Sequence, residues 1–342
     1  MTYRAIQSGF WAIALTLVPM LAPTQSEAAP SFRVPSLEQR LQARPPLRHS
    51  LPFEGSIYNM DFTPDGNFVA TSHSDGSVRL WAWRDGVQHL RFDRDTDNTV
   101  FSWVDITPDG QYFVTSKSNG TVQLREIGSG VVTQELPINT RGSGIVMVTA
   151  DGKTLVNATG LGSDFSISLW DMETQQEHQN LGGYRADYAA ITPNGYTLVS
   201  ASSSGTASVW DLRQGKRIST LPPGATEGIT ALAICPDRRA IYTAHSNGTI
   251  KQWNAQQGRL ERTLLTTRTP AKALAVSGDR QTLAISFGNY IQLRNLPTNQ
   301  PRYNLASNAP GPQIMSFSPD GRYFLNTDGA NDQSRLRIWQ IP

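Results

Sequence analysis

A turn signature that returns seven times is the feature of this sequence that most limits how the chain can fold. Each copy holds Asp or Asn, usually after Pro and before Gly. The copies are Pro64-Asp65-Gly66, Pro108-Asp109-Gly110, Ala150-Asp151-Gly152, Pro193-Asn194-Gly195, Pro236-Asp237, Gly278-Asp279 and Pro319-Asp320-Gly321. Such a period is typical of an array of small structural units, which bury their apolar faces only against one another.

A large side chain follows each turn at a similar offset and supports the same period. These side chains recur every 40 to 45 residues, at Trp81, Arg125, Trp170, Trp210, Trp253, Arg294 and Trp339. Because their period is that of the turns, we predict that they pack between successive units and do not stack on a cofactor.

Each unit is predicted to hold four strands, here called a to d. Runs rich in Val, Ile, Thr, Tyr and Phe alternate with hairpin pairs such as Asp75-Gly76 and Asn247-Gly248. In the first unit, strand a ends at Phe62, b runs through Val69, c runs through Leu80, and d covers residues 89–92. Four strands in each of seven units predict an all-β, seven-bladed β-propeller of antiparallel blades.

The turns and strand ends resemble those of the WD40 family, as in residues 318–321 and in Val209-Trp210-Asp211. The resemblance covers about residues 47–342 and implies a propeller that binds a protein or peptide. The sequence departs from the family pattern, because Trp-Asp occurs only at Trp170 and Trp210 and no His follows a Gly. The resemblance therefore implies an incomplete version of the family's buried His, Ser, Asp and Trp network.

The two ends of the repeat array complement each other. The last unit stops at Pro342 after three strands, whereas residues 47–51 resemble a fourth strand such as residues 217–221. We predict that this N-terminal strand completes the last blade, because an unpaired outer strand would leave an exposed edge.

Residues 1–28 have the layout of a secretory signal peptide, with Arg4, an apolar run over residues 10–21 and small residues before Ala29. A retained anchor is the alternative, but the run has 12 residues, fewer than the roughly 20 that span a bilayer. We expect an exported protein, periplasmic or extracellular, with residues 29–46 as a flexible arm that holds a short helix at residues 36–39.

Composition limits the chemistry. Lys and Arg exceed Asp and Glu by 30 to 28, too little for a protein that must neutralise many phosphates. Cys235 is the only cysteine, so stability must come from a large core without a disulfide. It stands where other units have Thr or Ser, just before the turn that joins strands a and b (the ab turn). We predict that it replaces a small hydroxyl-bearing side chain.

The five histidines are scattered, without a metal-binding helical pair. His73 and His245 stand at equivalent positions, just before the turns that join strands b and c (the bc turns). We predict that both side chains are solvated. The sequence thus predicts no metal, no cofactor and no nucleic-acid partner, and a monomeric, non-catalytic propeller.

The resemblance implies that the binding surface is one edge of the ring, the top rim. There the bc turns meet the loops that lead from strand d of one unit to strand a of the next (the da loops). The residues predicted there are Tyr58, Ser74, Ser102, Trp103, Ser118, Asp187, Tyr188, Thr230, Ser246, Lys272, Phe287 and Gln313. Trp103, Tyr188 and Phe287 are expected as exposed hot spots, with packing between blades as the alternative. The opposite charges of Asp187 and Lys272 indicate a mixed, protein-like ligand.

Two other functions remain open at this stage. A propeller enzyme that resembles a lactonase or a quinoprotein would place catalytic groups in the central channel. Asp61 and Asp105 are the acidic residues of the predicted inner strands there, apart from Asp187 at a strand start. An envelope assembly subunit would instead use the arm, in which Leu37 and Leu41 are four residues apart.

Overall fold

The computed structural model describes residues 45–93, 101–117, 119–136, 138, 145–159, 166–182, 187–192, 195–222, 227–307, 314–329 and 334–342, with the backbone alone at 101, 102 and 159. The predicted signal peptide, residues 29–44 of the arm, Ser118 and Gln313 lie outside these ranges. Ser102 is described by its backbone, within a strand.

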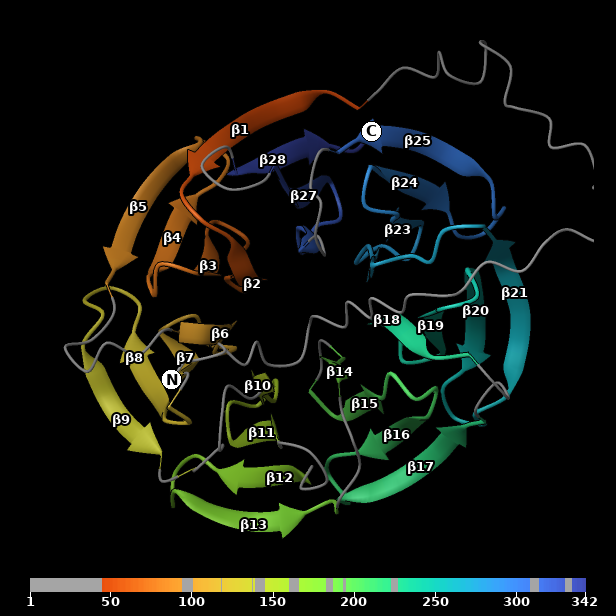
Figure 1. Ribbon diagram of the computed structural model, residues 1–342. Coiled ribbons are helices and arrows are strands. Elements are labelled where there is room, and N and C mark those ends of the chain that lie inside the picture. The colour runs from red at the N-terminus through yellow and green to blue at the C-terminus, as the bar shows by residue number, and fades with distance from the viewer. Residues whose placement is uncertain are drawn as a thin grey trace, which may run out of the picture.

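Seven four-stranded antiparallel sheets form a ring around a central axis (Figure 1). The inner strands are β2 (Ile57–Phe62), β6 (Phe101–Ile106), β10 (Ile145–Val148), β14 (Tyr188–Ile191), β18 (Ile229–Ile234), β22 (Ala273–Val276) and β26 (Met315–Phe317). The b strands are β3 (Val69–His73), β7 (Tyr112–Lys117), β11 (Thr154–Thr159), β15 (Thr197–Ala201), β19 (Ala240–His245), β23 (Thr282–Ser286) and β27 (Tyr323–Asp328). Each inner strand begins one blade, and blades are numbered along the chain.

The two outer layers complete the blades. The c strands are β4 (Val78–Ala82), β8 (Val122–Glu126), β12 (Ser166–Asp171), β16 (Ala207–Asp211), β20 (Thr249–Asn254), β24 (Tyr290–Asn295) and β28 (Ser334–Gln340). The outer strands are β5 (Val87–Phe92), β9 (Val132–Leu136), β13 (Gln176–Asn180), β17 (Lys216–Leu221), β21 (Leu260–Thr266), β25 (Pro301–Ala306) and β1 (Leu47–Phe53). The predicted fold class and blade number are confirmed.

The ring closes as predicted. Blade seven has the strand order β1-β28-β27-β26, so the first strand of the fold is the outer strand of the last blade. In this pair Leu51 lies opposite Leu336 and Phe53 opposite Ser334. Leu51 and Phe53 are buried in one cluster with Leu336 and Ile338, so closure joins backbone pairing to a shared apolar core.

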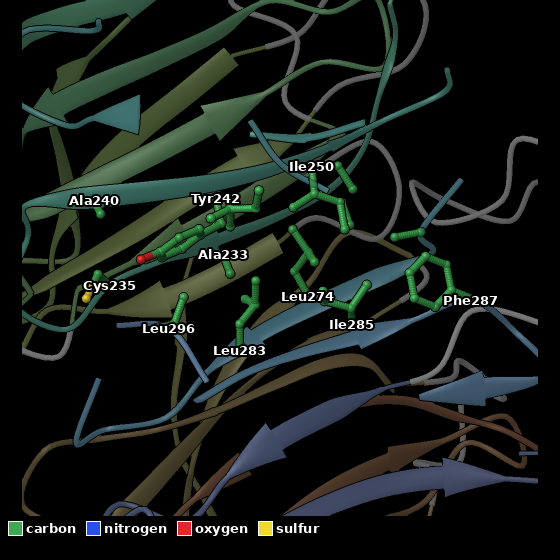
Figure 2. Close-up of a cluster of buried hydrophobic side chains, with 14 residues drawn as sticks. Ala233, Cys235, Ala240, Tyr242, Ile250, Leu274, Leu283, Ile285, Phe287 and Leu296 are labelled. Carbon is green, nitrogen blue, oxygen red and sulfur yellow. The ribbon is translucent and has the colours of Figure 1, made fainter. Parts of the chain in front are cut away.

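Apolar clusters between neighbouring blades form the core. Figure 2 shows the cluster that joins blades five and six, in which Tyr242 of β19 lies with Leu274, Leu283 and Phe287 of the next blade. The predicted exposure of Phe287 is wrong. It is 3% exposed and stacks on Tyr290 with ring centroids 4.8 Å apart, because it lies in the cluster that its blade shares with the preceding one.

The periodic tryptophans also pack between blades, as predicted. The Trp170 indole donates to Ser168 of its own strand at 2.9 Å, whereas the indoles of the other four donate to strand b. Trp81 donates to the hydroxyl of Thr71 at 2.8 Å, and that hydroxyl contacts Nε2 of His73 at 2.8 Å. Trp253, Thr243 and His245 repeat the chain in blade five, at 2.7 and 2.8 Å.

The predicted solvation of His73 and His245 is therefore wrong. Both side chains are buried. The ring of His73 also meets Phe53, from the closing strand, edge-on at 5.3 Å. Each histidine ends a b strand that faces the neighbouring blade, and this position outweighs the local turn sequence.

The ab turns lie at the opposite edge of the blades, the bottom rim. Five of them place glycine in the left-handed region, at φ 66° to 69°. Arg238 and Arg280 take this place in blades five and six, each at φ 63°. A non-glycine residue costs roughly 1–2 kcal/mol in that conformation.

Cys235 precedes the first of these two turns and is buried there, at the position of the predicted small hydroxyl.

Candidate protein-binding surface on the top rim

The bc turns and the da loops lie at one edge of the blades and are bonded to each other. In blade one the amide of Ser56 donates to the Ser74 hydroxyl at 2.8 Å. In blade five the amide of Gly228 donates to the Ser246 hydroxyl at 3.1 Å. The top rim is thus a set of short loops that hold one another in place.

Other polar residues predicted for this rim also bond within it. The Asp187 carboxylate accepts the amide of Ser203 at 2.7 Å, so it ties the da loop of blade four to the bc turn of that blade. The Thr230 hydroxyl donates to the carbonyl of Ala271 at 2.7 Å and links blades five and six. Lys272 is exposed, and its amide donates to the carbonyl of Ser286 at 2.8 Å.

The predicted aromatic residues differ in exposure. Tyr58, Trp103 and Tyr188 are half-buried, whereas Phe287 belongs to the core. Trp103 and Tyr188 pack against the interblade clusters. Burial raises the pKa of Tyr58, and burial together with the charge of Asp187 raises that of Tyr188. Both hydroxyls therefore stay protonated at neutral pH and are suited to donate hydrogen bonds at this edge.

Sequence reasoning missed a set of ion pairs near the rim. Arg79 pairs with Asp75 at 2.6 Å and Arg337 with Asp328 at 2.6 Å. Their common position in the repeat could have indicated these pairs, since both arginines stand two residues before a periodic tryptophan. Burial by itself would raise the pKa of Asp75, but donors on Ser77 and Arg79 bring it down to about 2.

Blade five carries the matching pair, Lys251 with Glu227 at 2.5 Å. Lys251 has the same offset from Trp253. The Lys251 ammonium lowers the pKa of the Glu227 carboxyl, against the effect of burial. In three blades, therefore, a basic residue of strand c forms an ion pair with an acidic residue near the top rim.

The two aspartates that the enzyme alternative assigns to the channel, here called the channel aspartates, lie on the inner strands β2 and β6. Asp61 accepts the amide of Ile106 at 2.8 Å, and Asp105 accepts the amide of Val148 at 2.7 Å. Burial raises the pKa of Asp61 to about 6, and burial followed by the charge of Asp61 raises that of Asp105 well above its usual range. Each carboxyl is therefore engaged in holding the next blade.

Neither a metal cluster nor a membrane-spanning helix appears within the part of the chain that the structure describes. No three side chains among its His, Cys, Asp and Glu residues gather closely enough to hold a metal ion. A search of the same residues for a helix with the length and apolar character needed to cross a bilayer gave no candidate.

Comparison with known proteins adds a family and one relative. Residues 46–82, 186–211 and 215–254 match the family described as WD domain, G-beta repeat. The chain is 25% identical over 157 residues to Periodic tryptophan protein 2 homolog of Caenorhabditis elegans. That region is 46% of this chain and 17% of the relative, so the chain matches less than a fifth of the relative's length.

Proposed function

We propose that this chain, a seven-bladed propeller with WD40 repeats, is a non-catalytic scaffold that binds a protein or peptide on its top rim. Proteins with such repeats generally act as interaction scaffolds, which supports the proposal. The carrying observation is the bonding of bc turns to da loops in blades one, four and five. Loops that are already ordered lose little conformational entropy on binding, which favours affinity.

The rim favours a partner of mixed charge. Asp75, Arg91 and Lys272 are exposed there and carry both signs. The half-buried ring of Tyr58 adds an apolar contact next to polar groups, a combination that is enriched at interface hot spots. A formal net charge of +2 gives no general attraction to nucleic acid.

A rim variant tests this proposal. Tyr58→Ser, Asp187→Asn and Lys272→Gln combined should weaken capture of the native partner at least about tenfold, since interface anchors each contribute roughly 1 kcal/mol or more. Asn at 187 keeps a carbonyl acceptor for Ser203. The partner is isolated from envelope fractions with the full chain and measured by surface plasmon resonance.

The matched control carries Val87→Ser and Lys216→Gln on outer strands, where both residues are exposed. It should bind as the parent chain does. Equal capture by a folded rim variant would refute the top rim as the binding surface.

We also propose that the propeller acts outside the cytoplasm. The pattern of residues 1–28 supports this, with Arg4, the apolar run and Ala28-Ala29. Mass spectrometry of protein recovered from native cells should find an N-terminus near Ala29. Recovery of chains that begin at Met1 in the cytosolic fraction would contradict the proposal.

A further inference from the structure

A groove lies on the bottom rim between blades five and six, on the face opposite the top rim. Its volume is about 430 Å³. The ab turns of the two blades form its sides through Asp237, Arg239 and Arg280, and Arg262 of β21 extends one wall. Cys235 and Tyr242 lie deeper, at one end of the apolar cluster that joins the blades (Figure 2).

Tyr242 gives the groove a polar group that has no hydrogen-bond partner among the described residues. The residue is 4% exposed, and Figure 2 shows its ring along the cluster with the hydroxyl oxygen near Cys235, away from Leu274 and Ile285. Its hydroxyl makes no hydrogen bond to the residues that the structure describes. Burial raises the pKa of Tyr242, so the hydroxyl keeps its proton. The hydroxyl oxygen is reached from the groove, so it can donate to an acceptor supplied from outside.

The acidic side chains of the groove are already occupied. Asp237 accepts the amide of Arg239 at 2.9 Å and the guanidinium of Arg280 at 3.1 Å. Glu261 accepts from the side chains of Gln252 at 2.7 Å and Asn254 at 3.3 Å. These carboxylates therefore have little capacity left for an incoming cation.

Arg239 is the available cation. It is exposed, and its guanidinium makes no hydrogen bond or ion pair with the residues that the structure describes. Arg262, by contrast, donates to Gln252 at 2.9 Å and to the carbonyl of Leu296 at 3.2 Å. A guanidinium and a hydroxyl that line the same groove, neither bonded to a described residue, can act as two donors to an anionic oxygen group.

The backbone at this groove supports a role beyond stability. Arg238 and Arg280 occupy the left-handed position of their turns, where five other blades have glycine. The two strained turns are neighbours, and the groove lies between them. Retained strain at adjacent positions of one surface is typical of functional sites.

We propose that this groove binds a carboxylate side chain of an acidic peptide segment, with Arg239 and Tyr242 as donors to its two oxygens. A carboxylate fits better than a phosphate, because Asp237 and Glu261 at the margin would repel a second negative charge. The site is independent of the top rim, so either can fail alone.

The test uses the full chain and a fluorescein-labelled decapeptide of alternating Glu and Gly, with a Gln-Gly decapeptide as its neutral counterpart. Fluorescence anisotropy should show saturable binding of the Glu peptide. Arg239→Gln and Tyr242→Phe should each weaken it about tenfold, the effect of losing one hydrogen bond to a charged group. Tyr242→Phe keeps the buried ring and should leave the melting temperature unchanged.

Arg322→Gln is the matched control. Arg322 is exposed and follows the turn glycine of blade seven, as Arg239 follows Arg238 in blade five. Its loss should change affinity less than twofold, as expected for a surface charge outside the site. The proposal is overturned if the parent chain shows no saturable binding up to about 1 mM peptide. It is also overturned if the Gln peptide binds equally, if neither groove variant weakens binding, or if the control weakens it as much.

Discussion

Replacement of both Leu51 and Phe53 by Ala should lower the free energy of unfolding by about 5–8 kcal/mol, since each large buried side chain contributes roughly 2–5 kcal/mol. Both residues lie in β1 and pack against strands at the opposite end of the sequence. Their loss weakens the seam on which closure depends. Urea denaturation followed by tryptophan fluorescence measures the change.

The control for this experiment changes the alternate residues of the same strand. Ser50→Ala and Pro52→Ala leave the buried cluster intact, because neither residue belongs to it. We expect a change below about 1 kcal/mol, as for most substitutions outside a core. An unaltered urea midpoint in the Leu51 and Phe53 variant would show that closure contributes little to stability.

His73→Gln should cost stability at pH 7 but much less at pH 4. Burial and then the nearby Arg79 guanidinium lower the pKa of His73 to about 3. The unfolded chain takes up a proton near pH 6.5, whereas the folded chain does so only near pH 3. Stability that depends on neutral His73 is therefore present above pH 6.5 and lost as the pH falls, by about 3 kcal/mol between pH 7 and pH 4.

The two channel aspartates act in the opposite direction. Their raised pKa values mean that the folded chain binds a proton more readily than the unfolded chain, so acidification from about pH 6 toward pH 4 stabilises the fold. The parent chain alone therefore shows a muted pH dependence. This contribution is present in both chains and cancels when His73→Gln is compared with its parent.

Urea titrations at pH 7 and pH 4 separate these contributions. The deficit of His73→Gln relative to the parent should shrink by about 3 kcal/mol on acidification. His178→Gln serves as control, because His178 is exposed on β13 and its replacement should give the same small difference at both pH values. A constant deficit for His73→Gln would show that this histidine is not held neutral.

The fold was readable from the sequence because its information is periodic. Turn and strand signals return in every unit, so a weak signal in one copy is supported by the others. The last unit lacked a fourth strand, and this predicted that the N-terminal strand completes it. His73 shows where this reasoning stops. Its neighbours Asp75 and Gly76 indicate an exposed turn, but the ring lies against Phe53 of another blade.

The top rim was predictable in position but not in bonding. The register of Asp187 placed it at the edge that holds the bc turns, yet its contact with the Ser203 amide depends on loop geometry. The bottom groove was not predictable, because it rests on a left-handed backbone at two arginines and on a hydroxyl without a partner. Neither property has a signature in residue type alone.

The pairing of β1 with β28 also determines how the ring responds to mechanical load. The two strands are antiparallel, and Leu47 lies opposite Trp339, with the Gln340 amide bonded to the Pro46 carbonyl at 3.0 Å. Opposed forces applied at Leu47 and Gln340 would therefore act at one end of the ladder. Its hydrogen bonds would break one after another, as in unzipping, and not together in shear, so the ring opens under a weaker pull along this direction than across any blade interior.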